Sequence, residues 1–408
     1  MSEDEPKRRL RVLTPAYYGM AFVTPRQSRH ELVRRPYKAP WRRLWRPLDA
    51  MAIGLRAGDC DVVHSYNRIP LTRKPFIVTF ESWFPRTLAY GSALFAETSM
   101  GVPTPGKEPP QSLDPGRDRR ASLNAPSDFG LRRFLMARLA RPECRRVVAM
   151  SDYAKNVLTL LNADSPHLEA VLRKSEIVYP NVPLRADGPK TLRGGPLRIL
   201  FVGNDFAQKG GVAAVRLAHL ARNEGVPVEV HVVSAMRYGK TVFADCPTPG
   251  AYDDDLELLQ GENVRVHGAL PNEEVLALMR SSDFLLLTSL DDTFGFSVIE
   301  AMSVGTPAIV SNVCALPELV QTGVNGCVVE LPLDRFRKWT ELRKRDWASL
   351  SAAYGLFAQR SLGFLRSVAD NPSTYEHLSA GACDQIRGKH DADTVGTRLD
   401  DIYEEAAR

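Results

Sequence analysis

The stretch from Ser289 to Ser311 reads Ser-Leu-Asp-Asp-Thr-Phe-Gly-Phe-Ser-Val-Ile-Glu-Ala-Met-Ser-Val-Gly-Thr-Pro-Ala-Ile-Val-Ser. It predicts a loop, a short apolar helix and a β-branched strand, because Gly305 and Pro307 are typical of a helix end. Two carboxylates stand eight positions apart in it, Asp292 in the loop and Glu300 on the helix. A loop, helix and strand in this order are part of a βαβ unit of parallel sheet.

The predicted helix start offers hydrogen-bond donors to a ligand. The N–H groups of Phe294, Gly295 and Phe296 lie where a helix has no internal acceptors, and the helix dipole there favours an anion or a hydroxyl-rich ligand. Gly295 also lets a ligand approach the backbone closely. The alternative is an acidic helix start that binds nothing, since an aspartate before the first turn is ordinary capping chemistry.

The whole chain, at 408 residues, suits two domains of about 150 to 200 residues each. Strand-like runs alternate with helical stretches, which predicts parallel sheets. The predicted strands are 11–13, 61–64, 76–80, 146–150 and 176–179, then 197–202, 228–233, 264–266, 284–288, 308–310 and 327–329. Residues 181–196 are predicted as a linker, 101–128 as an irregular loop, 332–390 as helical and 394–403 as a final helix.

The composition of the chain argues against several classes of protein. A net charge of only +5 argues against a nucleic-acid binder. Six cysteines without a C-x-x-C pair predict reduced thiols rather than a disulfide framework or a zinc site. No secretory signal is visible, and no apolar run approaches the length needed to span a bilayer. We therefore expect a cytoplasmic protein with no cofactor and no metal, in which peripheral contact with the inner face of the cell membrane is an option.

A second turn in the sequence is suited to an anion. The predicted strand 197–202 runs into Gly203 and Asn204, and Lys209 follows just before a helix. An ammonium beside a helix N-terminus can neutralise a diphosphate. The alternative is a structural turn with a solvated lysine.

Together these segments resemble the retaining glycosyltransferases of family 4, in the GT-B superfamily, whose signature is two glutamates separated by seven residues around Phe-Gly. The resemblance implies an α/β fold of GT-B architecture: two Rossmann-like domains facing across a cleft, with a C-terminal helix crossing back to the first. Residues 1–185 would form the acceptor-side domain, 186–390 the donor-binding domain and 391–408 the returning helix.

The resemblance also assigns roles to residues. Asp292 would contact hydroxyls of the donor sugar, Glu300 would hold the ribose and Lys209 the diphosphate. The strand and turn at 264–270 would receive the nucleobase. The implied donor-binding residues are Gly203, Asn204, Lys209, His267, Gly268, Leu270, Asp292, Phe294, Gly295, Phe296 and Glu300.

The sequence departs from the family pattern at several positions. Asp292 replaces the first glutamate, and Asn204 and Gln208 stand where many members have an arginine. Glu81 replaces a histidine at the end of the fourth strand, where it could bind a sugar hydroxyl, stabilise positive charge at the anomeric carbon, or cap a loop. Glu81, Asp292 and Lys209 are the predicted catalytic residues. The Gly-Gly loop after the first strand is missing, and Gly19 alone stands there.

Residues 23–48 are basic and aromatic. They hold Trp41, Trp45 and eight basic side chains: Arg26, Arg29, Arg34, Arg35, Lys38, Arg42, Arg43 and Arg46. This composition suits an anionic membrane or an anionic saccharide acceptor. The alternative is a solvated loop.

These observations predict a metal-independent, retaining enzyme that transfers a hexose-type sugar from a UDP-, GDP- or ADP-sugar to a saccharide or lipid-linked acceptor, in bacterial-type polysaccharide or glycolipid biosynthesis. The alternative is a non-catalytic subunit that binds sugar nucleotides or saccharides. An NAD-dependent oxidoreductase is excluded, because neither strand-turn carries a G-x-G-x-x-G. Asp253 to Asp255 could suggest a metal-binding Asp-x-Asp, but their Pro- and Gly-rich flanks predict a solvated loop.

Overall fold

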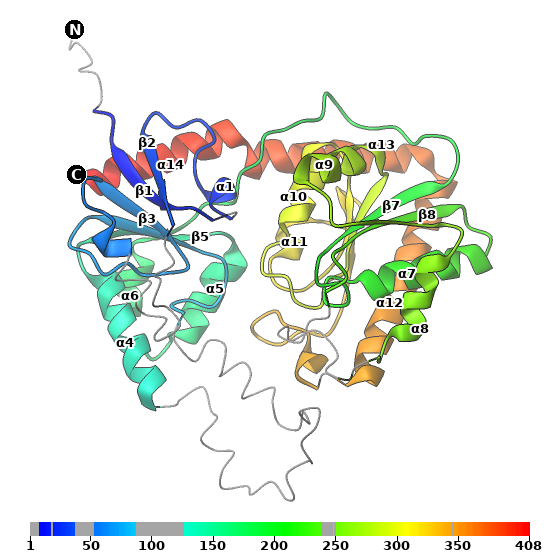
Figure 1. The fold of residues 1–408 in the computed structure, drawn as a ribbon, viewed down its shortest axis with the longest axis horizontal. Coiled ribbons are helices and arrows are strands. Elements are labelled where there is room, and N and C mark those ends of the chain that lie inside the picture. Colours follow the sequence, from blue (N-terminus) through cyan, green and yellow to red (C-terminus); the bar gives the residue numbers. More distant parts are fainter. Residues whose placement is uncertain are drawn as a thin grey trace, which may run out of the picture. The chain divides into compact units, whose positions relative to one another are not determined.

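The computed structural model describes residues 8–17, 19–36, 53–86, 126–237, 248, 250–344 and 346–408. Its chain divides into two compact units. The first contains the described residues up to Asn181 together with His390–Arg408, and the second is Val182–Lys389. Each unit is a parallel sheet with helices on its faces (Figure 1). The chain leaves the first unit inside the segment predicted as a linker.

The first unit is built on a sheet of six parallel strands within the described residues, in the order β2-β1-β3-β4-β5-β6. Its strands are β1 (Arg11–Pro15), β2 (Glu31–Arg35), β3 (Val62–Tyr66), β4 (Phe76–Phe80), β5 (Cys144–Ala149) and β6 (Ser175–Ile177). Its helices are α1 (Met20–Val23), α4 (Pro126–Ala140), α5 (Asp152–Leu161), α6 (Leu168–Leu172) and α14 (Ala392–Ala407). Ser151 caps α5 by accepting the Ala154 N–H.

Alternating side chains of these strands fill two separate cores, because successive residues of a strand point to opposite faces. On one face Leu13, Val63 and Val78 pack with residues of α4, α5 and α6. On the other face Val12, Val62 and Ile77 pack with residues of α14. Burial on both faces explains why β4, Phe-Ile-Val-Thr-Phe, is almost continuously apolar.

The C-terminal helix α14 is fixed to the first sheet by a buried polar contact. His64, on β3, shares hydrogen bonds of 2.8 Å with the Tyr403 hydroxyl of α14 and with Thr79 Oγ1 of β4. Asp391 starts the helix by accepting the Thr394 N–H. The predicted return of the C-terminal helix to the first domain is therefore confirmed.

The buried His64 should make stability depend on pH. Complete burial lowers the pKa of His64 to about 3, so the ring is neutral in the folded protein. The unfolded chain takes up a proton below its ordinary pKa of about 6.5, so stability is full above that pH and is lost as the pH falls towards 3. We expect a loss of up to about 1.4 kcal/mol per pH unit in this window.

The measurement is denaturant unfolding of the full chain between pH 7 and 4. His64→Gln should flatten the pH dependence relative to wild type. The exposed His377, in the second unit, provides the matched control, and His377→Gln should leave the slope unchanged. Equal slopes for wild type and His64→Gln would contradict the prediction.

The second unit contains six parallel strands within its described residues, in the order β12-β11-β10-β7-β8-β9. These strands are β7 (Leu197–Val202), β8 (Val228–Val233), β9 (Val264–Gly268), β10 (Phe284–Leu287), β11 (Ala308–Ser311) and β12 (Gly326–Val329). The helices are α7 (Gly211–Asn223), α8 (Asp253–Glu257), α9 (Asn272–Ser281), α10 (Phe296–Ser303), α11 (Leu316–Leu319), α12 (Trp347–Asp370) and α13 (Pro372–Gln385), with 3₁₀ turns Leu258–Gln260 and Thr340–Arg343 and a π turn Ile386–His390 that leads to α14.

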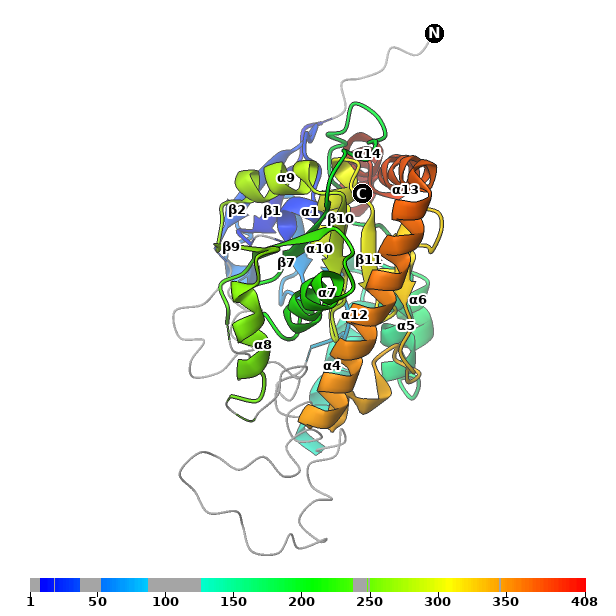
Figure 2. The ribbon, with the colours of Figure 1, turned by 90° about the vertical axis from the view of Figure 1, so that its right-hand side faces the viewer.

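The helices of the second unit pack on the sheet and on one another. Helix α7 contacts β8 and α12, and α10 contacts α9 and α13. Figure 2 shows α7 and α12 side by side. Within the described residues, no helix is both long enough and apolar enough to cross a membrane.

Three predictions about local structure were wrong. Residues 31–35, expected only as part of a basic surface stretch, form the edge strand β2. Residues 332–346 were expected to be helical, yet α12 begins only at Trp347, where Asp346 caps the Ser349 N–H. Asp253–Asp255 lie in α8 rather than a solvated loop, and Asp255 is buried against Arg216 at 2.6 and 2.8 Å. Of the predicted loop 101–128, residues 101–125 lie outside the described residues. Helix α4 begins at Pro126, so the last three residues of the predicted loop are helical.

Candidate functional site

The strand order of the second sheet marks where a ligand would bind. Parallel α/β sheets bind ligands beyond the carboxyl ends of their strands, at the point where the strand order reverses. In this sheet β7 lies beside β8 on one side and β10 on the other, so the order reverses between β7 and β10. The loop after β7 carries Lys209 and the loop after β10 carries Asp292. The two residues therefore belong to neighbouring loops at the expected edge.

Lys209 and Asp292 form an ion pair at this edge. Lys209 Nζ donates to Asp292 Oδ2 at 2.7 Å, and the two side chains are 25% and 13% exposed. Burial alone would lower the pKa of Lys209, but Asp292 and, more weakly, Asp291 and Asp205 outweigh it and raise the pKa. The site therefore holds an ammonium ion at neutral pH. Asp292 Oδ1 also accepts the Phe294 N–H at 3.3 Å. Of the three N–H groups predicted to face a ligand, that of Phe294 is therefore hydrogen-bonded within the protein.

Glycines bring the Lys209 turn against the end of β10. A Cβ on Gly203 would lie 2.6 Å from the Lys209 Cβ. Gly210 has a φ of +96°, and a Cβ there would lie 2.6 Å from Thr288 Oγ1 and 2.7 Å from the Thr288 carbonyl oxygen. The Gln208 carbonyl accepts the Leu290 N–H and the Ser289 hydroxyl, both at 3.0 Å. These contacts fix the distance between the two loops.

Gly210 should therefore be intolerant of substitution. We expect Gly210→Ala to lower the free energy of unfolding of the second unit by about 2–4 kcal/mol, because backbone strain and steric overlap add. Gly225 is the matched control, since its φ is +66° and a Cβ there would meet nothing within 4 Å. Gly225→Ala should cost only the strain, about 1–2 kcal/mol. Equal losses in chemical denaturation would show that the contact with Thr288 is unimportant.

Helix α10 starts at the same edge. Gly295 is its N-terminal cap with a φ of +91°, and a Cβ there would lie 2.6 Å from Leu316 Cδ2. The rings of Phe294 and Phe296 lie 5.4 Å apart at an angle of 46°. Phe294 is buried and Phe296 is partly exposed. The glycine thus lets the chain turn sharply between a buried and a partly exposed aromatic residue.

Glu300 projects from α10 and is 8% exposed. Its Oε1 accepts a hydrogen bond of 2.9 Å from Asn272 Nδ2, at the start of α9. Its charge also acts on Arg185, whose pKa burial lowers and Glu300 partly restores. Arg185 in turn donates to Ser303 Oγ at 3.2 Å. Asn272 and Arg185 were missed in the sequence because nothing in their local sequence links them to Glu300.

The segment predicted to receive the base lies at the β8–β9 edge of the sheet. His267 stacks on His231 with ring centres 5.1 Å apart, and Nε2 of His267 lies 2.9 Å from Nδ1 of His231. His231 Nε2 contacts Glu229 Oε1 at 2.6 Å. Burial and His231 lower the pKa of His267. Gly268 adopts a φ of +67°, and its carbonyl accepts the Ser234 N–H at 3.0 Å, while Leu270 is half-buried just before α9.

Asn204 connects the Lys209 turn to the loop after β8. Its side-chain oxygen accepts the Ala235 N–H at 3.3 Å, and its carbonyl accepts the Arg237 N–H at 2.9 Å. Arg237 is exposed. An exposed basic residue thus follows β8 next to the position where the family often has an arginine. Arg237 was missed in the sequence because it is far along the chain from β7, the strand that precedes the Lys209 turn. The separation is about the length of one βαβ unit.

Glu81 lies in the first unit, directly after β4 (Phe76–Phe80). Its carboxylate accepts hydrogen bonds from the Tyr66 hydroxyl at 2.8 Å and from Asn67 Nδ2 at 3.1 Å, and it pairs with Arg86. Asn67 adopts a φ of +53° and also accepts the Glu81 N–H. Three donors therefore hold this carboxylate at the carboxyl edge of its own sheet.

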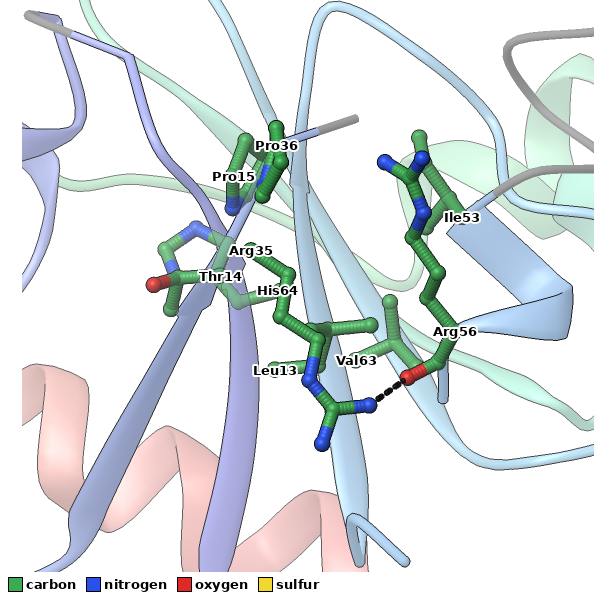
Figure 3. A pocket seen from close by; sticks show the side chains of 9 residues that line it. All are labelled: Leu13, Thr14, Pro15, Arg35, Pro36, Ile53, Arg56, Val63 and His64. Atoms are coloured by element: carbon green, nitrogen blue, oxygen red, sulfur yellow. Dashed lines mark hydrogen bonds between the residues drawn. The ribbon is translucent and has the colours of Figure 1, made fainter. Parts of the chain in front are cut away.

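A small pocket in the first unit lies beside β1 and β3, where the order of that sheet reverses (Figure 3). About 10 Å³ is accessible to the centre of a water molecule, which is room for roughly one water. The Arg35 guanidinium crosses it to donate to the Arg56 carbonyl. The pocket is lined by Leu13, Thr14, Pro15, Arg35, Pro36, Ile53, Arg56, Val63 and His64. It is too small to hold a sugar.

The basic stretch 23–48 is partly bound to its own unit. Arg26 donates to Asn181, Arg29 pairs with Asp401 and Glu404, and Arg35 pairs with Asp59. These side chains are therefore less available to an external anion than predicted. Lys38, Trp41, Arg42, Arg43, Trp45 and Arg46 lie outside the described residues.

Comparison with known proteins finds a family match within the second unit. Residues 187–336 match the family model described as Glycosyl transferases group 1. Over these residues the chain is similar to that family. The matched region contains the Lys209 turn, β9, Asp292 and Glu300.

Curated relatives are similar to about a third of the chain. An uncharacterized 41.2 kDa protein in the cps region of Klebsiella pneumoniae is 29% identical over 133 residues, 33% of this chain and 32% of the relative. Glycogen synthase of Mycobacterium tuberculosis is 30% identical over 144 residues, 35% and 29% of the two chains. An amylovoran biosynthesis glycosyltransferase of Erwinia amylovora is 31% identical over 137 residues, 32% and 31%. The matched part thus spans about a third of these relatives.

Solved structures share the fold of the whole chain. A glycosyltransferase from Rickettsia africae has a TM-score of 0.59 at 14% identity, covering 98% of this chain and 99% of its own. HepE of Anabaena, solved with UDP, has a TM-score of 0.59 at 10% identity, covering 97% and 99%. At these identities the comparison shows the fold alone. It confirms the predicted GT-B class with two Rossmann-like domains.

Proposed function

We propose that the protein is a retaining glycosyltransferase that moves a hexose-type sugar from a nucleoside diphosphate sugar to a saccharide or lipid-linked acceptor. The observation that carries the proposal is the Lys209–Asp292 pair, which sits where the strand order reverses in the group 1 domain. Relatives named for a cps region and for amylovoran biosynthesis support a role in bacterial-type polysaccharide or glycolipid biosynthesis. HepE, solved with UDP and UDP-glucose, supports a nucleotide-sugar donor.

The proposed roles follow from charge and position. Lys209 and the nearby helix start neutralise the diphosphate, whose negative charge grows as it leaves the sugar, so the proposed reaction uses neither a metal nor a cofactor. Asp292 accepts hydrogen bonds from donor-sugar hydroxyls and Glu300 from the ribose. His267, Gly268 and Leu270 contact the base, and Gly203, Asn204, Phe294, Gly295 and Phe296 supply backbone close to the donor. Glu81 stabilises the positive charge that develops at the anomeric carbon of the donor sugar.

The proposal places the protein in the cytoplasm, with peripheral contact to an anionic membrane through residues 23–48. The free thiols of the five described cysteines are compatible with a reducing compartment. Within the described part of 23–48, Arg26, Arg29 and Arg35 already contact other residues of the protein. We therefore expect the exposed Arg34 to contribute most to membrane contact.

A second candidate function is a non-catalytic subunit that binds sugar nucleotides or saccharides. The observation that favours it is Glu81, whose carboxylate is already held by Tyr66, Asn67 and Arg86. A carboxylate fully engaged by its own unit has less capacity to respond to charge on a reacting sugar.

Turnover separates the two functions. The full chain should release nucleoside diphosphate from one of UDP-, GDP- and ADP-hexoses, with a rate that rises when an acceptor saccharide or lipid-linked saccharide is added. Proton NMR of the product should show the anomeric configuration of the donor retained. Tight donor binding without release from any donor would support the non-catalytic alternative, and an inverted anomer would contradict the retaining mechanism.

A further inference from the structure

A second lysine–aspartate pair lies beside the first. Asp291 precedes Asp292 in the loop after β10, and its carboxylate pairs with Lys338. Lys338 Nζ also lies 3.2 Å from Cys314 Sγ, which donates weakly to Asp291 at 3.7 Å. The Lys338 and Asp291 side chains are only 12% and 15% exposed, so water screens this pair little.

The backbone of Asp291 is fixed as well. Its carbonyl accepts a hydrogen bond of 2.7 Å from Gln208 Nε2, and its N–H donates to Ser289 Oγ at 3.3 Å. Gln208 is the residue directly before Lys209. The Asp291 charge is therefore held close to the turn that carries Lys209 and cannot move away from it.

Lys338 comes from a segment that is itself constrained. Leu333 and Trp339 form an antiparallel bridge, and the Lys338 N–H donates to Asp334 Oδ1 at 3.0 Å. The neighbouring Arg337 pairs with Glu318 at 3.0 Å. This turn delivers Lys338 to Asp291 from a part of the chain with no signature motif.

The two pairs are electrostatically coupled. Asp291 acts on Lys209 and helps to raise its pKa, after the larger effect of Asp292. Without Lys338, the full charge of Asp291 would act on Lys209 and would also repel any incoming diphosphate. At a few ångströms in a partly buried site, one such charge alters binding by tenfold or more.

We propose that Lys338 is a positioning residue for donor binding, which neutralises Asp291 and thereby leaves the charge of Lys209 available to the donor's diphosphate. The inference rests on the proposed function. It differs from a direct phosphate contact, because Lys338 acts through Asp291. Removing both charges should therefore restore what removing Lys338 alone destroys.

The test is calorimetric binding of nucleoside diphosphate to the full chain, with whichever of UDP, GDP and ADP the wild type binds most tightly. Lys338→Met should raise Kd about tenfold or more, Lys338→Arg should stay within about threefold of wild type, and Asp291→Asn, which removes the repelling carboxylate, should not raise Kd. The double variant Lys338→Met with Asp291→Asn should return to within about threefold. Lys344, on the same segment and 62% exposed, gives the matched control, and Lys344→Met should change nothing.

Two outcomes would overturn the inference alone: a wild-type Kd for Lys338→Met, or a double variant that binds as weakly as Lys338→Met. The second would mean that Lys338 contacts phosphate directly or only maintains structure. Thermal unfolding of each variant separates folding defects from binding defects, because the double variant leaves no unpaired buried charge. If the wild type binds none of the three nucleotides, the proposed function fails and the inference fails with it.

Discussion

Replacing Lys209 by alanine should abolish release of nucleoside diphosphate from the donor, with a loss of at least about a hundredfold in turnover. The structure places Lys209 where the strand order of the second sheet reverses. Burial alone would lower the pKa of Lys209 there, but Asp292 outweighs it and raises the pKa, so the side chain stays positively charged. The diphosphate gains negative charge as it leaves the sugar, so the loss should appear in kcat as well as in donor KM. The measurement is steady-state release of nucleoside diphosphate.

Loss of Lys209 also leaves Asp292 without its cation, which can destabilise the domain on its own. The double variant Lys209→Ala with Asp292→Asn should therefore recover thermal stability without recovering turnover. Lys344→Ala is again the control and should retain wild-type rates. Turnover within about threefold of wild type for Lys209→Ala would exclude this lysine from the donor site.

Replacing Glu300 by glutamine should weaken donor binding by about ten- to a hundredfold while leaving the fold intact, because a hydrogen bond to a charged acceptor contributes about 1.5–3 kcal/mol. The substitution keeps the shape of the side chain and an oxygen for the Asn272 amide, which donates to Oε1 at 2.9 Å. What it removes is the negative charge of a nearly buried carboxylate. The measurement is donor KM and nucleotide Kd, with the melting temperature as a check on folding.

Glu318 offers a matched control on the same unit. It lies on a different helix from Glu300 and pairs with Arg337 at 3.0 Å. Glu318→Gln should leave donor KM unchanged. If Glu318→Gln and Glu300→Gln affected KM equally, the signal would reflect general destabilisation rather than loss of a ribose contact.

Much of the fold could be predicted because buried parallel strands carry an unusually clear signal. Phe284–Leu287 is apolar throughout, and Val228–Val233 is rich in valine, as strands covered on both faces should be. The edge strand Glu31–Arg35 was missed because it is half-exposed and carries three charged residues. At the edge of a sheet, the sequence resembles that of a surface loop.

The helix predicted over residues 332–346 is not present in the described part of that segment, and the prediction failed for a different reason. Trp339 and Leu342 are buried and spaced as on a helical face, but Trp339 bridges back to Leu333 instead. Apolar spacing alone does not distinguish a helix from a compact turn that buries the same side chains.

The candidate site was predictable where one segment carries several of its residues. Asp292 and Glu300 lie in a single loop and helix, and Lys209 follows a clear strand. Partners that come from distant segments were not predictable. Asn272 beside Glu300 and Lys338 beside Asp291 are brought into place only by the tertiary fold.

The central claim is that the carboxyl edge of the second sheet, between β7 and β10, binds a nucleoside diphosphate. Equilibrium binding of UDP, GDP and ADP to wild type and to Lys209→Ala tests it most directly. The account predicts that wild type binds one of the three and that Lys209→Ala loses at least about tenfold in affinity for it. Wild type that binds none of them, or a Lys209→Ala variant that binds as tightly as wild type, would contradict it.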